Sequence, residues 1–80
     1  MSTSVVSPEP RAVEVSCTED VLRVRLADGR ELFVPLEWFP RLRNATTEAR
    51  HDFRLIGGGI GIQWPTVDED ISIAGLLATR

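Results

Sequence analysis

Two early stretches of the chain alternate between apolar and polar residues, which is the period expected of strands with one buried face. In residues 11–17 the apolar side consists of Val13, Val15 and Cys17. In residues 21–26 it consists of Leu22, Val24 and Leu26, with Arg23 and Arg25 on the opposite side. The pattern predicts two strands that bury these apolar sides.

The third strand, "ELFVPL", follows a turn whose length can be decided from register. A two-residue loop at Asp28-Gly29 would place Leu26 beside Glu31, on the same face of the sheet. A three-residue loop with Gly29 in the left-handed conformation keeps apolar residues together, so we predict it. Its expected pairs are Leu26–Arg30, Val24–Leu32, Arg25–Glu31 and Arg23–Phe33. This register predicts a cross-strand ion pair and an arginine over an aromatic ring.

The second half of the chain predicts short elements only. Pro40 interrupts residues 36–44, which favours short helical turns, and Thr46 is a candidate cap for a further turn. Residues 53–64 predict a hairpin around a glycine turn. Residues 67–70, "VDED", are expected to form a loop, and the last element is a short helix capped by Ser72.

These elements predict an α+β fold. We expect a small antiparallel sheet of about five short strands, with the helical turns and a short C-terminal helix on one face. Residues 1–10, rich in Ser, Thr and Pro, are expected to form a flexible N-terminal arm, and residues 11–80 a single α+β domain.

Composition narrows the functional classes. The 80 residues have a net charge of −3, which is too acidic for a protein that coats nucleic acid without specificity. All nine basic residues are arginine, and the chain has one cysteine and one histidine. This content excludes an internal disulfide and argues against a Cys/His zinc site. No apolar run is long enough for a membrane span and no signal peptide is recognisable, so we expect a cytoplasmic protein.

Two motifs suggest chemistry at first sight. The "GGGIG" tract resembles a phosphate loop in composition, but no lysine follows it and the next element is a predicted strand, so a turn with positive φ is favoured. Asp68 and Asp70 are spaced to grip a divalent cation, with His51 as a third ligand, but acidic residues ahead of a helix also stabilise its N-terminus. Cys17 falls on the predicted inner side. We therefore expect no catalytic residues, no metal and no cofactor.

The aromatic residues next to prolines are the strongest candidates for binding. Tryptophan and arginine together are typical of protein–protein hot spots when they are exposed, and typical core residues when they are not. We predict a partner-binding surface built from Trp38, Arg41, Arg43, Trp64, Pro65, Asp68 and Asp70.

Three segments together resemble a known family. "DGRELFVPLEWFPRL", "NAT" and above all "GIGIQWPTVDEDISIAGLL" are similar to the bacterial domain of unknown function 2442, over about Val13 to Leu77. The resemblance implies a small α+β domain similar to the N-terminal domain of a Nitrosomonas protein of known structure. It also implies a gene layout of the toxin–antitoxin kind, and a C-terminal helix-turn-helix domain in some relatives that is not expected here. No catalytic residues are known for the family, so it assigns none.

The leading hypothesis is a non-enzymatic protein-binding module, a candidate antitoxin-like partner of a neighbouring small basic protein that acts by occlusion. A homodimer is a further candidate assembly. The first alternative is a nucleic-acid-associated transcriptional regulator that uses Arg23, Arg25, Arg41 and Arg43, although nucleic acid is not favoured without a helix-turn-helix domain. The second alternative is a divalent-metal-dependent enzyme built on Asp68, Asp70 and His51.

Overall fold

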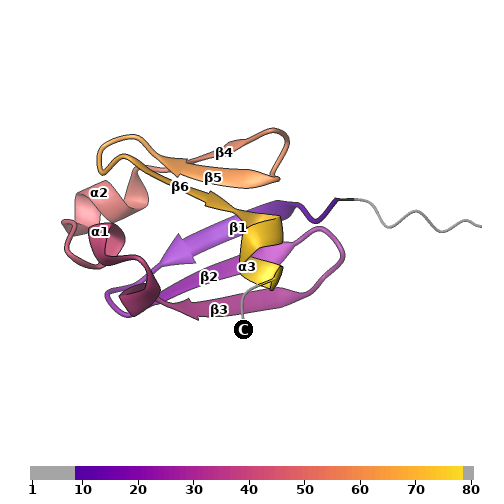
Figure 1. The fold of residues 1–80 in the computed structure, drawn as a ribbon, viewed down its shortest axis with the longest axis horizontal. Helices are drawn as coiled ribbons and strands as arrows, with labels where there is room; N and C mark the ends of the chain where they lie inside the picture. The colour runs from indigo at the N-terminus through magenta and orange to yellow at the C-terminus, as the bar shows by residue number, and fades with distance from the viewer. Residues whose placement is uncertain (1–8, 79–80) are drawn as a thin grey trace, which may run out of the picture.

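The computed structural model describes residues 9–78, which form two three-stranded antiparallel sheets and four short helical segments (Figure 1). The expected arm at residues 1–10 lies outside the described residues except for its last two positions. In chain order the elements are β1 (Ala12–Cys17), β2 (Val21–Leu26), β3 (Glu31–Pro35), the 3₁₀ turn η1 (Leu36–Trp38), α1 (Pro40–Arg43), α2 (Thr47–His51), β4 (Arg54–Ile56), β5 (Gly61–Trp64), β6 (Glu69–Ser72) and α3 (Ile73–Ala78). None of the helices within residues 9–78 is long and apolar enough to cross a membrane.

The prediction of one sheet with about five strands was wrong, although the α+β class is correct. The strands form two sheets, ordered β1-β2-β3 and β4-β5-β6, which lie one above the other (Figure 1). Each sheet has an apolar side that must be covered, and stacking covers both sides at once. The helical segments η1, α1 and α2 lie at one end of the two sheets, and α3 lies towards the other (Figure 1).

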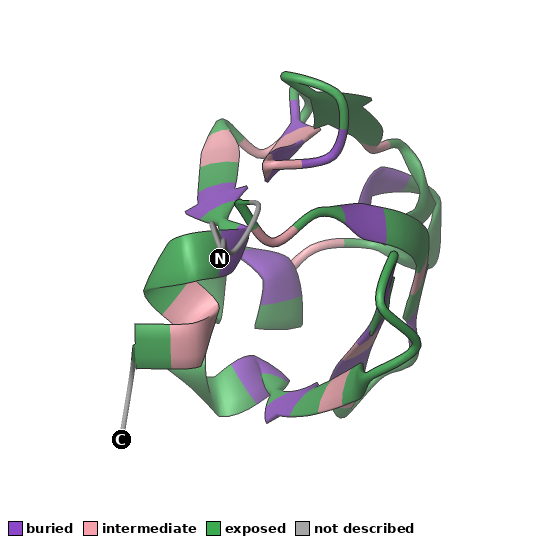
Figure 2. Cartoon of the chain, turned by 90° about the vertical axis from the view of Figure 1, so that its right-hand side faces the viewer, coloured by how far each residue is buried: buried purple, intermediate pink, exposed green. Residues whose placement is uncertain are grey.

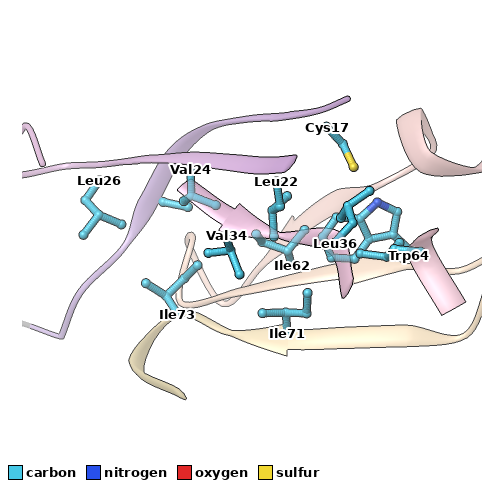
Figure 3. Packing of buried hydrophobic residues seen from close by; sticks show 12 residues of the cluster. Cys17, Leu22, Val24, Leu26, Val34, Leu36, Ile62, Trp64, Ile71 and Ile73 are labelled. Atoms are coloured by element: carbon cyan, nitrogen blue, oxygen red, sulfur yellow. The ribbon is translucent and has the colours of Figure 1, made fainter. Parts of the chain in front are cut away.

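The hydrophobic core lies between the two sheets (Figures 2 and 3). Leu22, Val24 and Leu26 point inward from β2, as the alternation predicts. The residues that face them from the second sheet and the start of α3 are Ile62, Trp64, Ile71 and Ile73. Leu36 and Leu42 extend the core beneath η1 and α1, and both are fully buried.

The hairpin formed by β2 and β3 confirms the predicted three-residue turn. Gly29 has φ of +96°, and the Leu26 amide donates to the Arg30 carbonyl at 2.8 Å. The ladder pairs Val24 with Leu32, and it also contains the predicted pairs Arg25–Glu31 and Arg23–Phe33. Apolar residues of both strands therefore face the core together, and the register argument was sufficient to find this turn.

The inward placement of Val13 was wrong. The register of β1 against β2 shifts between Ala12 and Glu14, so Val13 is the extra residue of a β-bulge. It is 56% exposed, whereas Ala12 takes the inward position opposite Leu26. Simple alternation cannot show a bulge, because the sequence pattern around Val13 is that of a regular strand.

The loop predicted at residues 67–70 is confirmed for Val67 and Asp68 but was wrong for the two residues that follow. Glu69 and Asp70 begin β6, which pairs with β5 and continues directly into α3. The acidic residues are therefore not the cap of this helix. Both predicted hydroxyl caps are confirmed, because Ser72 Oγ accepts from the Gly75 amide at 3.1 Å and Thr46 Oγ1 accepts from the Ala49 amide at 3.0 Å.

The glycine tract forms the turn between β4 and β5, and it touches β1 across the molecule. Gly57, Gly58 and Gly59 all have positive φ. The Gly59 carbonyl accepts from the Ala12 amide at 2.7 Å, and a Cβ on Gly59 would overlap the Ala12 carbonyl oxygen. The tract is therefore a turn, as predicted, and it also joins the two sheets at the β-bulge through close backbone contact.

We predict unequal effects for alanine at two glycines that share the left-handed conformation. Gly29→Ala should lower the free energy of unfolding by about 1–2 kcal/mol, because nothing lies near its Cβ and only the backbone is strained. Gly59→Ala adds an overlap with β1, which should cost about 1–3 kcal/mol more. Urea unfolding of both variants measures the difference, and equal losses would contradict the contact between the sheets.

Candidate functional site

Five of the predicted partner-binding residues lie at the end of the molecule formed by the helical turns. Trp38 on η1 is 48% exposed, and Arg41 and Arg43 on α1 are exposed. Pro65 and Asp68 are exposed on the β5–β6 loop. The two segments are joined because Arg41 Nη1 donates to the Asp68 carbonyl at 2.7 Å. We call these five residues the helical-end surface.

Local sequence explains why these side chains point outward. Leu36 and Leu42 are the buried anchors of η1 and α1, and Pro40 starts α1 at a position where its missing amide hydrogen has no consequence. Trp38 and Arg41 lie between the two anchors in sequence, and both are exposed. The turn at Asp68, with φ of +57°, directs the loop towards Arg41.

The prediction that Trp64 belongs to the partner-binding surface was wrong, because Trp64 is fully buried and unavailable to a partner. Its ring lies near Leu36 and Cys17 in the core (Figure 3), with the Phe53 ring centroid 6.0 Å away. Its indole nitrogen donates to the Arg50 carbonyl at 2.9 Å. The hydrogen bond satisfies the one polar group of the buried ring, so Trp64 ties β5 to α2.

Arg50 is the residue that sequence reasoning missed. It is 7% exposed, and its Nη1 donates to the carbonyl of Ala45 at 2.7 Å and to those of Leu42 and Arg43 at 3.4 Å. The guanidinium therefore caps the C-terminal end of α1, where carbonyl groups lack helical partners. Nothing in the sequence distinguishes Arg50 from the other arginines, because its acceptors are backbone atoms that any residue supplies.

Cys17 is a buried core residue, as its position on the inner side predicts. Burial raises the pKa of its thiol, and the nearby positive charge of Arg50 only partly opposes this effect. Because the thiolate is the reactive form, a raised pKa makes this side chain a poor nucleophile.

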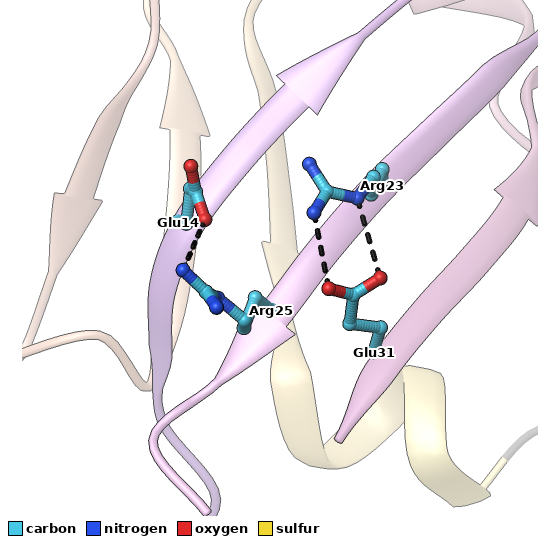
Figure 4. A network of polar contacts seen from close by, with 4 residues as sticks. All are labelled: Glu14, Arg23, Arg25 and Glu31. Atoms are coloured by element: carbon cyan, nitrogen blue, oxygen red, sulfur yellow. Dashed lines mark hydrogen bonds and ion pairs between the residues drawn. The ribbon is translucent and has the colours of Figure 1, made fainter. Parts of the chain in front are cut away.

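The arginines on the outer face of the first sheet are engaged by carboxylates (Figure 4). Arg23 makes two hydrogen bonds to Glu31, at 3.0 and 3.4 Å, and Arg25 lies 2.9 Å from Glu14. The Glu31 hydrogen bond raises the pKa of Arg23, and the same bond lowers the pKa of Glu31. The predicted Arg25–Glu31 ion pair was wrong, because the real pair is diagonal, and Arg23 turns towards Glu31 instead of the Phe33 ring.

The acidic residues are dispersed. Asp68 is in the turn with its side chain fully exposed, Asp70 is in β6, and His51 ends α2. Residues 9–78 contain no group of three or more His, Cys, Asp and Glu side chains that could hold a metal ion. Asp70 instead lines a shallow hollow of about 180 Å³, together with Phe39 and Leu76. The cluster required by the metal-dependent alternative is therefore not assembled.

Comparison with known proteins agrees with the resemblance seen in the sequence. Residues 12–80 match the model of the family described as "Protein of unknown function (DUF2442)", and the chain belongs to this family. A solved structure of a protein of unknown function from Rhodospirillum rubrum is similar, with a TM-score of 0.73 and 29% sequence identity over 88% of this chain and 87% of that chain. This structural relative is not the expected Nitrosomonas protein. No curated protein matched the sequence.

We predict that the buried and the exposed arginine next to α1 differ in their contribution to stability. Arg50→Met keeps the side-chain volume but leaves the end of α1 uncapped, which should lower the free energy of unfolding by about 1–3 kcal/mol. Arg41→Ala removes an exposed contact and should lower it by less than about 1 kcal/mol. Urea unfolding monitored by circular dichroism measures both values. A loss for Arg50→Met no larger than that for Arg41→Ala would show that the buried contacts are not stabilising.

Proposed function

We propose that this protein is a small non-enzymatic binding module whose helical-end surface docks onto a protein partner. The observation that carries the proposal is the exposure of Trp38 beside Arg41 and Arg43 on a short, well-anchored segment. Tryptophan and arginine are the residues most enriched in binding hot spots. About half of Trp38 is exposed, and its segment is held by the buried anchors Leu36 and Leu42, so a partner can cover this surface without any rearrangement of the domain.

The support beneath this surface favours binding without a change of shape. Leu36 and Leu42 anchor η1 and α1, and the buried Arg50 caps the end of α1. Arg41 fixes the β5–β6 loop against α1. A surface held in this way loses little conformational entropy on binding, which improves affinity for a given contact area.

The charge of the chain suggests the kind of partner. A net charge of −3 favours a basic partner, mainly through faster association. We propose that the partner is a small basic protein encoded beside this gene and that the module acts as its antitoxin-like inhibitor, by covering its active face. The same proposal places the protein in the bacterial cytoplasm, where its single cysteine stays reduced.

Two other functions have less support. Arg23 and Arg25 are engaged by Glu31 and Glu14, so they are poorly suited to neutralise phosphates in the nucleic-acid alternative. The metal-dependent alternative lacks a ligand cluster among the described residues. Both observations favour the binding module.

We predict that co-expression with the product of the adjacent gene yields a complex that co-purifies, and that it relieves any growth inhibition that product causes alone. In that complex Trp38→Ser should weaken binding about thirtyfold, the loss of a hot-spot residue worth about 2 kcal/mol. Titration calorimetry measures the affinity.

Leu55→Ser is the matched control, because Leu55 is an exposed apolar residue on β4, away from the helical-end surface. It should leave the affinity unchanged. The absence of any complex would refute the antitoxin-like role, and equal effects of the two variants would refute the helical-end surface as the contact.

A further inference from the structure

We propose that β3 is a self-association edge, through which two copies of this chain pair their β3 strands antiparallel about Phe33. The proposal concerns a surface distinct from the helical-end surface and does not depend on the proposed function. It rests on three observations: the open edge of β3, the exposure of Phe33, and the match of both backbone and side chains in one register.

The first observation is the backbone of β3. No described strand pairs with its outer edge, because β3 is the last strand of the sheet β1-β2-β3. Two hydrogen bonds mark the ends of the β2–β3 ladder: the Leu26 amide donates to the Arg30 carbonyl, and the Leu36 amide donates to the Asp20 carbonyl. The even-numbered residues of β3 therefore direct their backbone N–H and C=O groups towards β2. Because the pattern alternates in an antiparallel ladder, Glu31, Phe33 and Pro35 direct theirs towards the open edge.

The second observation is the side chain at the centre of this edge. Phe33 is 64% exposed, the largest exposed fraction among the large hydrophobic residues described. The residue of β2 that pairs with Phe33 is Arg23, whose side chain turns towards Glu31 and leaves the ring uncovered. An exposed aromatic residue on an unpaired edge strand is a typical contact for another strand.

The third observation is that one register satisfies both copies. A two-fold axis at Phe33 places Phe33 opposite Phe33 and Glu31 opposite Pro35. Phe33 can donate and accept in this arrangement. Pro35 has no amide hydrogen, so it accepts from the Glu31 amide but returns no hydrogen bond to the Glu31 carbonyl. The register therefore keeps the mutual hydrogen bonds of the two Phe33 residues and the bond from each Glu31 amide to Pro35 of the other copy, and these would hold an isologous pair together.

Side chains agree with the same register. On the core side it places the half-buried Leu32 opposite Val34, so that apolar residues meet and the two cores become continuous. On the outer side the two Phe33 rings meet, and Glu31 faces Pro35 and not a second carboxylate. An axis at Leu32 would give as many hydrogen bonds, but it would place Arg30 opposite Val34 and Glu31 opposite Phe33.

The other sheet edges are less suited to a second copy. The glycine turn already contacts β1 at Ala12, and β4 has only three residues. The Ile73 amide donates to the Ile60 carbonyl, so the odd-numbered residues of β6 direct their backbone groups towards β5. The backbone groups on the open edge of β6 therefore include those of Asp70, a charged residue. Among the described strands, β3 combines length, an exposed aromatic residue and a self-matching register.

The test is the oligomeric state of the full chain, measured by analytical ultracentrifugation from about 10 μM to about 1 mM, the range in which a small interface of this kind associates. We expect a monomer–dimer equilibrium. Phe33→Lys places two positive charges at the axis and should weaken the dimer about tenfold or more. Val13→Lys is the matched control, because Val13 is comparably exposed on β1, and it should leave the equilibrium unchanged.

Disulfide formation between introduced cysteines tests the register. Phe33→Cys should form a disulfide-linked dimer under mild oxidation, because directly paired residues have Cα atoms about 5.5 Å apart. Glu31→Cys and Leu32→Cys should not form this disulfide, because in this register neither residue lies opposite the same residue of the other copy. The two Glu31 positions are about 14 Å apart along the strand. The native Cys17 is buried and does not compete.

A chain that stays monomeric up to the highest concentration would overturn the proposal. So would a dimer that persists in Phe33→Lys, or cross-linking at Leu32 in preference to Phe33. Circular dichroism of each variant checks that it is folded, so that loss of the dimer is assigned to the edge.

Discussion

The hydrogen bond from the Trp64 indole to the Arg50 carbonyl is the interaction around which the rest of this domain is arranged. Trp64 is the largest fully buried side chain and lies between the two sheets. The same residue, Arg50, uses its guanidinium to cap the end of α1. Trp64 therefore holds α2 through the backbone carbonyl of Arg50, and the guanidinium of the same arginine holds α1. In this way a chain of 80 residues supports a segment with little regular structure.

A second constraint acts at the opposite end of β5. The glycine turn brings the backbone of Gly59 against Ala12, at the bulge in β1. A side chain on Gly59 would overlap the Ala12 carbonyl oxygen, and Gly57 and Gly58 have positive φ, so these three glycines are explained by the fold itself. With Trp64 at one end of the hairpin and Gly59 at the other, the second sheet is fixed over the first.

Much of the first sheet could be predicted from the sequence, because a period of two and one register argument define β2, β3 and the turn at Gly29. The two hydroxyl caps could also be predicted, since they depend on local sequence. The bulge at Val13 and the stacking of two sheets could not, because both arise from contacts between segments distant in sequence. The candidate site was predicted in part: Trp38 and Arg41 are exposed, whereas Trp64 is buried and Arg50 was missed because its acceptors are backbone atoms.

These assignments separate two kinds of residue within the segments that define the family. Trp64 and the glycines hold the fold together, whereas Trp38, supported by that interior, is exposed on the helical-end surface. Hydrogen exchange of the two indole N–H groups, followed by NMR, tests this separation most directly. The account predicts that the Trp64 signal exchanges only through global unfolding, while that of Trp38 exchanges within minutes. Equally rapid exchange of both signals would contradict it.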